Sequence, residues 1–343
     1  MPAADDGAAV QALLTAGHWK RARAILEPRV ASNPSAGEPY YQLSRVKTAY
    51  HEYEAALPLA EKAVALDARD IRFHTQLGIV LGRLAQKASL LKQIGLAKRS
   101  RKEFEAALAL NPDYLNALEA LMNYTWEAPG VVGGDKNKAR DIAGHMTRID
   151  PVRGLLAQAQ LALWQDDSAK AEELYRKAAE STSTSFEALI DAAGAELNEK
   201  PPKYNLAERY ALAAEAMAPD RAGSYIALAR VYAGQGRMAD LNALLAKAAQ
   251  DDPDNLHPRL AAAEVLLANG HELPRAEALA REYLAQEPEG EMPTIAQARW
   301  RLALILEKEG RTKEALAELS AAHRQEPGND AIDRDVKRLK HAD

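Results

Sequence analysis

The chain has 343 residues and a formal net charge of −5, with 47% hydrophobic and 27% charged residues. This composition is ordinary for a globular protein, and the length leaves room for two domains or one long array. The acidic balance argues against nucleic acid as the main partner, because a phosphate backbone favours a clearly basic surface. The lack of cysteine excludes disulfides, thiolate nucleophiles and Cys-zinc sites.

The N-terminal sequence predicts the cellular compartment of the protein. The segment MPAADDGAAV lacks the basic and apolar regions of a signal peptide. A methionine placed ahead of PAADD is what remains when a signal peptide is removed before expression. We therefore predict the bacterial periplasm, with the cytoplasm as the alternative. No apolar run of about 18 residues occurs, so we expect no membrane-spanning helix.

Helical hairpins with a period of about 34 residues follow one another along the chain. Residues 222–255 show the frame well. One helical stripe contains Tyr225, Leu228, Ala229 and Tyr232, Gly236 breaks the chain, and a second stripe contains Leu241, Leu245 and Ala248. Pro253 then ends the second helix. The same frame occurs near the N-terminus, where it ends at Pro34, and near the C-terminus, where it ends at Pro327.

The residues at which successive hairpins end indicate the domain organisation. They fall at Pro34, Ala68, Pro112, Pro151, Ser183, Pro219, Pro253, Pro288 and Pro327, at spacings from 32 to 44 residues. This pattern predicts nine hairpins over residues 3–329, forming a single solenoid in residues 1–343. The apolar Ile332, Val336 and Leu339 predict a capping helix over 330–341. Between 154 and 221 the pattern leaves the register of the first helices open.

The frame resembles the tetratricopeptide repeat (TPR) family over nearly the whole chain, in a degenerate form that keeps the small residues and terminators. The resemblance implies an all-α, right-handed solenoid, in which small residues let neighbouring hairpins stack closely. It also implies a binding surface on the concave side, lined by the first helix of each hairpin.

The stretch APGVVGGDKNKA, from Ala128 to Ala139, contains a loop at 128–135. The loop does not fit the Walker A motif. Asn137 stands where the motif has Ser or Thr, and the loop follows a predicted helix instead of a strand. We expect Pro129 to end one helix, Gly133 and Gly134 to supply positive φ, and Asp135 to cap the next helix. The loop resembles one in a subgroup of bacterial TPR proteins that are mostly exported. A role in rimming a groove is the functional alternative.

The segment 82–103 adds about ten residues to the third hairpin. It contains Leu90, Leu91, Ile94 and Leu96 beside the basic residues Lys87, Lys92, Lys98, Arg99, Arg101 and Lys102. The first interpretation is a pair of longer helices whose basic residues are solvated. The second is an amphipathic segment that covers a groove or contacts an acidic partner or lipid headgroups. Gly95 interrupts the apolar run, so the segment is a poor membrane anchor by itself.

Motifs for catalysis and cofactors are missing from the sequence. No H-E-x-x-H, G-x-S-x-G, dinucleotide-binding or Ca²⁺-loop pattern occurs, and no two histidines lie four residues apart. Acidic pairs such as Asp166–Asp167 fall at turns, where they cap helices. We therefore expect no enzyme activity, no metal and no cofactor.

Carrying the concave positions of the TPR family over to this chain gives the candidate site. The predicted ligand-binding residues are Tyr41, Arg45, Ile79, Arg83, Asn123, Trp126, Ile226, Arg230 and Trp300. They mix charged and apolar side chains, and the apolar ones could instead pack between repeats if the register shifts by one residue. The pair of residues that forms the family's carboxylate clamp is not matched in neighbouring repeats, so we do not predict binding of chaperone tails.

Two functions follow from this face. The first is a scaffold or adaptor that binds a protein or peptide partner, including a membrane-associated transport component; this rests on the resemblance. The second is a carrier of an apolar small molecule or lipid in a periplasmic transport system, which rests on the apolar inner positions and the two added segments.

Overall fold

The computed structural model describes residues 5–290 and 293–340. Within these ranges the chain forms nineteen α-helices and one short 3-10 helix, and no strand. The clustering of contacts divides the chain into two compact units, Met1–Ala192 and Ala193–Asp343, with the boundary inside α11. The all-α fold class is therefore confirmed; that the whole chain is a single solenoid stays a prediction.

The helices of the first unit are α1(Asp5–Ala16), α2(Trp19–Ser32), α3(Gly37–Ala49), α4(Tyr53–Leu66), α5(Ile71–Lys87), α6(Leu90–Leu110), α7(Leu115–Glu127), η1(Gly130–Val132), α8(Lys136–Ile149), α9(Pro151–Leu163), α10(Ser168–Ala179) and the first part of α11(Phe186–Asn198). The second unit continues with α12(Tyr204–Met217), α13(Ala222–Gly234), α14(Met238–Asp251), α15(His257–Asn269), α16(Leu273–Tyr283), α17(Ile295–Lys308), α18(Thr312–Gln325) and α19(Asp330–Lys340).

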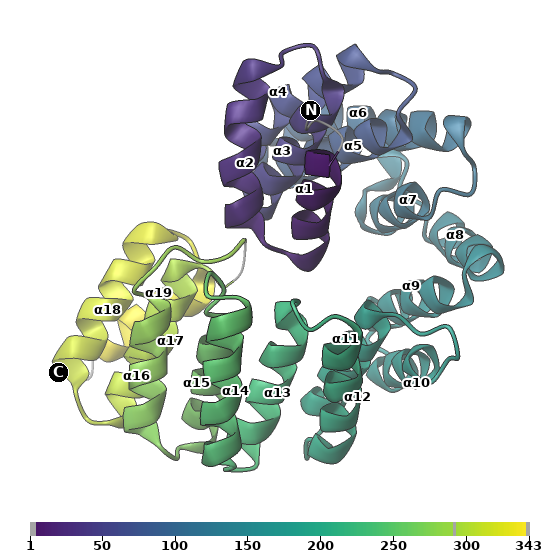
Figure 1. Cartoon of the computed structure of the whole chain (residues 1–343). Helices are drawn as coiled ribbons and strands as arrows, with labels where there is room; N and C mark the ends of the chain where they lie inside the picture. Colours follow the sequence, from purple (N-terminus) through teal and green to yellow (C-terminus); the bar gives the residue numbers. More distant parts are fainter. Residues whose placement is uncertain (1–4, 291–292, 341–343) are drawn as a thin grey trace. The chain divides into compact units, whose positions relative to one another are not determined.

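Consecutive helices pair as hairpins in each unit (Figure 1). In the first unit the first helices of neighbouring hairpins also touch, since α3 contacts both α1 and α5, and α5 contacts α7. In the second unit α15 contacts both α13 and α17 in the same way. This creates an inner layer of first helices, which is the layer that positions the candidate site.

Small residues sit where two helices approach most closely, as the sequence predicts. Gly78 of α5 faces the ring of Phe104 on α6, and a Cβ at Gly78 would lie 2.4 Å from the nearest ring carbon. Ser100 is fully buried beside them and donates a 2.7 Å hydrogen bond to the carbonyl of Gly78. The close crossing of α5 and α6 therefore depends on the missing side chain.

The α13–α14 hairpin has the predicted frame. The residues of both stripes are buried, and Gly236 adopts φ +69° at the turn between the two helices. Because a left-handed backbone conformation strains other residues, this glycine terminates α13 and sets the direction of α14. Helix α14 ends at Asp251, just before Pro253.

The chain ends in a capping helix. Helix α19 buries Ile332, Val336 and Leu339, the three apolar residues that predict it, against the last hairpin. The predicted helix extends one residue further, to His341, which lies outside the described residues, as do residues 3 and 4 of the first predicted hairpin.

Candidate functional site

A groove with a volume of about 1230 Å3 runs along the inner layer of the first unit. Its walls come from α1, α3, α5 and α7, and from both added segments, since the start of α6 and the 128–132 part of the loop also line it. The two features that interrupt the repeat pattern therefore meet at one site. The volume exceeds the usual range for small-molecule pockets, about 300–1,000 Å3, and fits an extended ligand.

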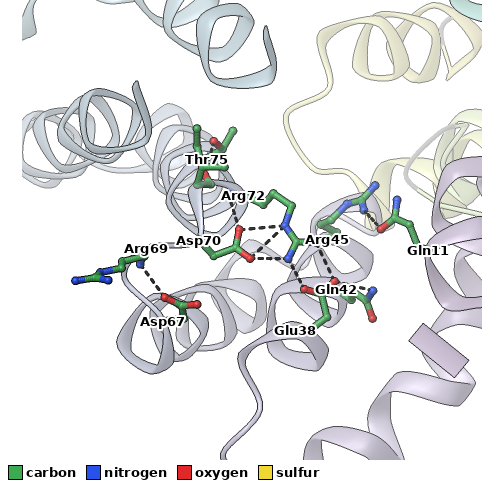
Figure 2. A network of polar contacts seen from close by, with 10 residues as sticks. Gln11, Glu38, Gln42, Arg45, Asp67, Arg69, Asp70, Arg72 and Thr75 are labelled. Atoms are coloured by element: carbon green, nitrogen blue, oxygen red, sulfur yellow. Dashed lines mark hydrogen bonds and ion pairs between the residues drawn. The ribbon is translucent and has the colours of Figure 1, made fainter. Parts of the chain in front are cut away.

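One half of the groove is polar and tightly hydrogen bonded (Figure 2). Glu38 at the start of α3 and Asp70 before α5 both accept hydrogen bonds from the guanidinium of Arg72, at 2.7 Å and 2.5 Å. Asp70 loses hydration by burial, but the hydrogen bonds from Arg72 outweigh this and lower its pKa. Glu38 also accepts a 2.9 Å hydrogen bond from Gln42. Arg72 thus bridges two carboxylates and fixes the groove wall between two neighbouring hairpins.

Arg45 is the available cation at this end. The guanidinium of Arg45 lies 5.7 Å from the centre of the Tyr41 ring. The guanidinium of Arg72 lies 5.2 Å from the centre of the same ring. A 3.3 Å hydrogen bond to Gln11 orients Arg45 (Figure 2). Among the described residues, no carboxylate lies within ion-pair distance of Arg45 or Arg83. Both positive charges are therefore available to an anionic group of a ligand.

The other half of the groove is apolar. Ile79 of α5, Leu90 and Ile94 of α6, and Val131 and Val132 of the loop line it. Leu90 is 72% exposed and Val131 is 79% exposed, so two large apolar side chains stand at its edge. Apolar surface left in water in this way is a common mark of a binding site.

The loop is held in place by its own residues. Gly133 has φ +98°, and a Cβ at Gly134 would lie 1.7 Å from the carbonyl oxygen of Ala128, so both positions require glycine. The expectation of a positive φ is confirmed for Gly133; Gly134 instead allows the close approach. Tyr124 donates a 2.7 Å hydrogen bond to the carbonyl of Val132. Asp135 caps α8 as predicted, accepting from two backbone N–H groups at 2.9 Å and 3.1 Å.

Asn123 contributes an unsatisfied polar group to the groove. Its side-chain oxygen is buried and has no hydrogen-bond partner within the described chain. A buried acceptor without a partner is unfavourable by about 1–3 kcal/mol. A ligand that donates a hydrogen bond to Asn123 would remove this penalty.

Five of the nine predicted site residues come together in this groove: Tyr41, Arg45, Ile79, Arg83 and Asn123. Trp126 does not line it. Its side chain is only 8% exposed and stacks on Trp164, with 5.6 Å between the ring centres. It belongs to the hydrophobic core between α7, α8 and α9. The structure therefore places Trp126 in the packing between repeats, which is the alternative that the sequence left open.

The remaining three predicted residues lie in the second unit. Ile226 and Arg230 are half-buried on α13, where Arg230 donates a 3.2 Å hydrogen bond to Asn198. Trp300 on α17 donates a 2.8 Å hydrogen bond to Asp335 of the capping helix and lies under the guanidinium of Arg301. Their role in binding stays a prediction.

Sequence reasoning missed several groove residues. Glu38 and Arg72 stand 34 residues apart at the starts of equivalent helices, a repeat-period spacing that could have identified the pair. Leu90 and Val131 were recognised as parts of the two added segments, but their positions on one groove could not be read from periodicity.

The described residues contain neither a metal-binding cluster nor a membrane-spanning helix. No group of three or more His, Asp or Glu side chains there is arranged to hold a metal ion. No helix in that part of the chain is long and apolar enough to cross a membrane.

Comparison with known proteins shows the fold. No protein-family model and no curated protein matches the chain. Among solved structures, yeast Tom70 is 14% identical in sequence and has a TM-score of 0.52. The match covers 97% of this chain and 80% of Tom70. A thermophilic TPR protein of Thermus thermophilus is 20% identical over 57% of this chain and all of its own, with a TM-score of 0.49. A TPR protein of Parabacteroides merdae is 15% identical over 89% of this chain and 98% of its own, with a TM-score of 0.46. The chain has an all-α, TPR-like fold of helical hairpins.

Proposed function

We propose that this protein is a non-enzymatic binding protein that holds an extended peptide segment of a partner protein in the groove of its first unit. The proposal rests on one observation: both added segments and the inner helices α1, α3, α5 and α7 line the same groove. The buried Ala97 and Val132 pack together in one small hydrophobic cluster, which holds the two added segments against each other at the groove.

The chemistry of the groove supports a peptide with two kinds of side chain. Arg45 and Arg83 offer positive charge to an acidic group, and Asn123 offers an acceptor to a donor such as a backbone N–H. Ile79, Ile94 and Val131 offer an apolar surface to a Leu, Ile or Phe side chain. An extended peptide presents all three groups within a few residues, at about 3.3 Å per residue.

A displayed library of random twelve-residue peptides tests this function. We expect the full chain to enrich peptides that carry an acidic residue near apolar ones. Arg45→Ala and Ile79→Asp should each weaken the selected peptides at least tenfold by isothermal titration calorimetry. Arg69→Ala is the matched control, because Arg69 lies next to the same network but does not line the groove (Figure 2). Equal affinity of the Arg45 and Arg69 variants would refute the groove as the peptide site.

The second candidate function is transport of an apolar small molecule or lipid. The apolar half of the groove, with Leu90 and Val131 exposed at its edge, favours it. Mass spectrometry of an organic extract of protein purified from its native host is the test. A stoichiometric lipid, lost in the Ile79→Asp variant, would support the carrier over the peptide scaffold; an empty extract would argue against it. The periplasm remains our proposed compartment, with the cytoplasm as the alternative.

A further inference from the structure

Helix α6 has two faces with different surroundings. Leu90, Gln93, Ile94, Ala97, Ser100 and Phe104 follow the i, i+3, i+4, i+7 pattern and line the groove. Leu91, Lys98 and Lys102 follow one another at i, i+7 and i+11 on a different face, and none of them lines the groove. All three are exposed, and Leu91 is 87% exposed, the highest value among the exposed large apolar side chains.

The charge of residues 84–102, which include most of this second face, has one sign, and the next residue on the face, Glu105, is paired with Arg101. Residues 84–102 contain six Lys or Arg and no Asp or Glu, although the whole chain has a net charge of −5. Arg99 and Arg101 are paired with Glu61 and Glu105. Lys92, Lys98 and Lys102 have no ion-pair partner among the described residues and keep their positive charge for an external group.

We infer that the α5–α6 turn and the outer face of α6 dock onto an anionic lipid surface, with Leu91 entering the headgroup region and Lys92, Lys98 and Lys102 contacting the headgroups. Protruding leucines beside lysines form the pattern of segments that lie at a membrane interface. Negative lipid headgroups complement the free lysines, each of which contributes binding energy near the surface. Leu91, Lys92, Lys98 and Lys102 lie outside the groove, whereas the neighbouring Leu90 lines it, so this surface adjoins the proposed peptide site but uses different side chains.

Sedimentation of the full chain with vesicles tests the inference. We expect binding to vesicles with 30% phosphatidylglycerol in phosphatidylcholine, at about 0.1 M salt, and much weaker binding to pure phosphatidylcholine. Raising the salt to about 1 M shortens the screening length from about 10 Å to about 3 Å and should release the protein.

Leu91→Ser removes the apolar contact and should weaken vesicle binding about tenfold. Lys98→Glu reverses a charge and should weaken it by a similar factor. Leu110→Ser, at the other end of the same helix and 46% exposed, and Lys313→Glu in α18 are the matched controls that should leave binding unchanged. Circular dichroism checks that each variant keeps its helices.

Equal binding to neutral and anionic vesicles would overturn the inference, as would no binding to either. Equal losses for Leu91→Ser and Leu110→Ser would also overturn it, because binding would then not depend on the turn. Binding of the selected groove peptides should be the same for wild type and Leu91→Ser, which keeps this test apart from that of the proposed function.

Discussion

Replacing Gly78 with alanine is expected to destabilise the first unit, although alanine is the better helix former. Helix propensity alone would stabilise the protein by up to about 1 kcal/mol. The new Cβ, however, would lie 2.4 Å and 2.6 Å from two ring carbons of Phe104. Phe104 is 3% exposed and packs edge-to-face against Tyr124, so its ring has little room to move. Overpacking of this kind costs about 1–3 kcal/mol, so the clash should outweigh the propensity.

Urea unfolding followed by circular dichroism measures the effect. Gly95→Ala is the control, because Gly95 lies in the same hairpin with nothing within 4 Å of the added Cβ, and it should stabilise the protein slightly. The double variant Gly78→Ala with Phe104→Leu should recover about 1 kcal/mol relative to the sum of the single changes. If Gly78→Ala were as stable as Gly95→Ala, the close crossing of α5 and α6 would not be as described.

Three further outcomes follow from named contacts. Trp126→Ala should reduce the free energy of unfolding by about 3–5 kcal/mol, because it removes a buried ring stacked on Trp164; unchanged stability with lost ligand binding would return Trp126 to the site. Asp135→Ala should lower the thermal midpoint by removing about 1 kcal/mol of capping from α8, whereas Asp135→Ser should keep most of it. Burial, reinforced by the nearby charge of Arg230, lowers the pKa of His257 to about 4, so between pH 6.5 and pH 4 the unfolded chain binds a proton that the folded one does not. Stability should therefore fall over this range by up to about 3 kcal/mol more in wild type than in His257→Gln, measured by urea unfolding at pH 7 and pH 4.5. Equal losses would contradict a neutral, half-buried His257.

Local signals predicted the helices well. Helix α7 ends at Glu127, two residues before Pro129, and α8 begins at Lys136, directly after Asp135, as the sequence indicates. Capping residues and glycines determine helix ends through contacts within about one turn of the chain. Their effect can therefore be predicted without knowledge of the fold. Pro151 has a different role from the one expected: it stands at the first turn of α9, with Asp150 as the cap, and so begins a helix as well as separating two hairpins.

The site was predictable only in part, because helix periodicity gives a face and not its neighbours. Tyr41, Arg45 and Ile79 lie where the inner-face positions put them. Trp126 shares the face of Asn123 by spacing, but the following hairpin covers the end of α7 and Trp164 packs onto it. Which surface of a helix end is covered depends on tertiary contacts that no local pattern contains.

The confinement of the groove to residues 7–132 has a thermodynamic consequence. In a repeat array, each hairpin is stabilised mainly by its contacts with the neighbouring hairpins. A bound ligand therefore protects from local unfolding the hairpins that it touches and those next to them. At a free concentration of 100 times its Kd, a ligand adds about 2.7 kcal/mol to the state that binds it. Amide hydrogen exchange should then slow in α3, α5 and α7 while α15 to α19 exchange as before. The exchange pattern would thus locate the ligand even before its identity is known.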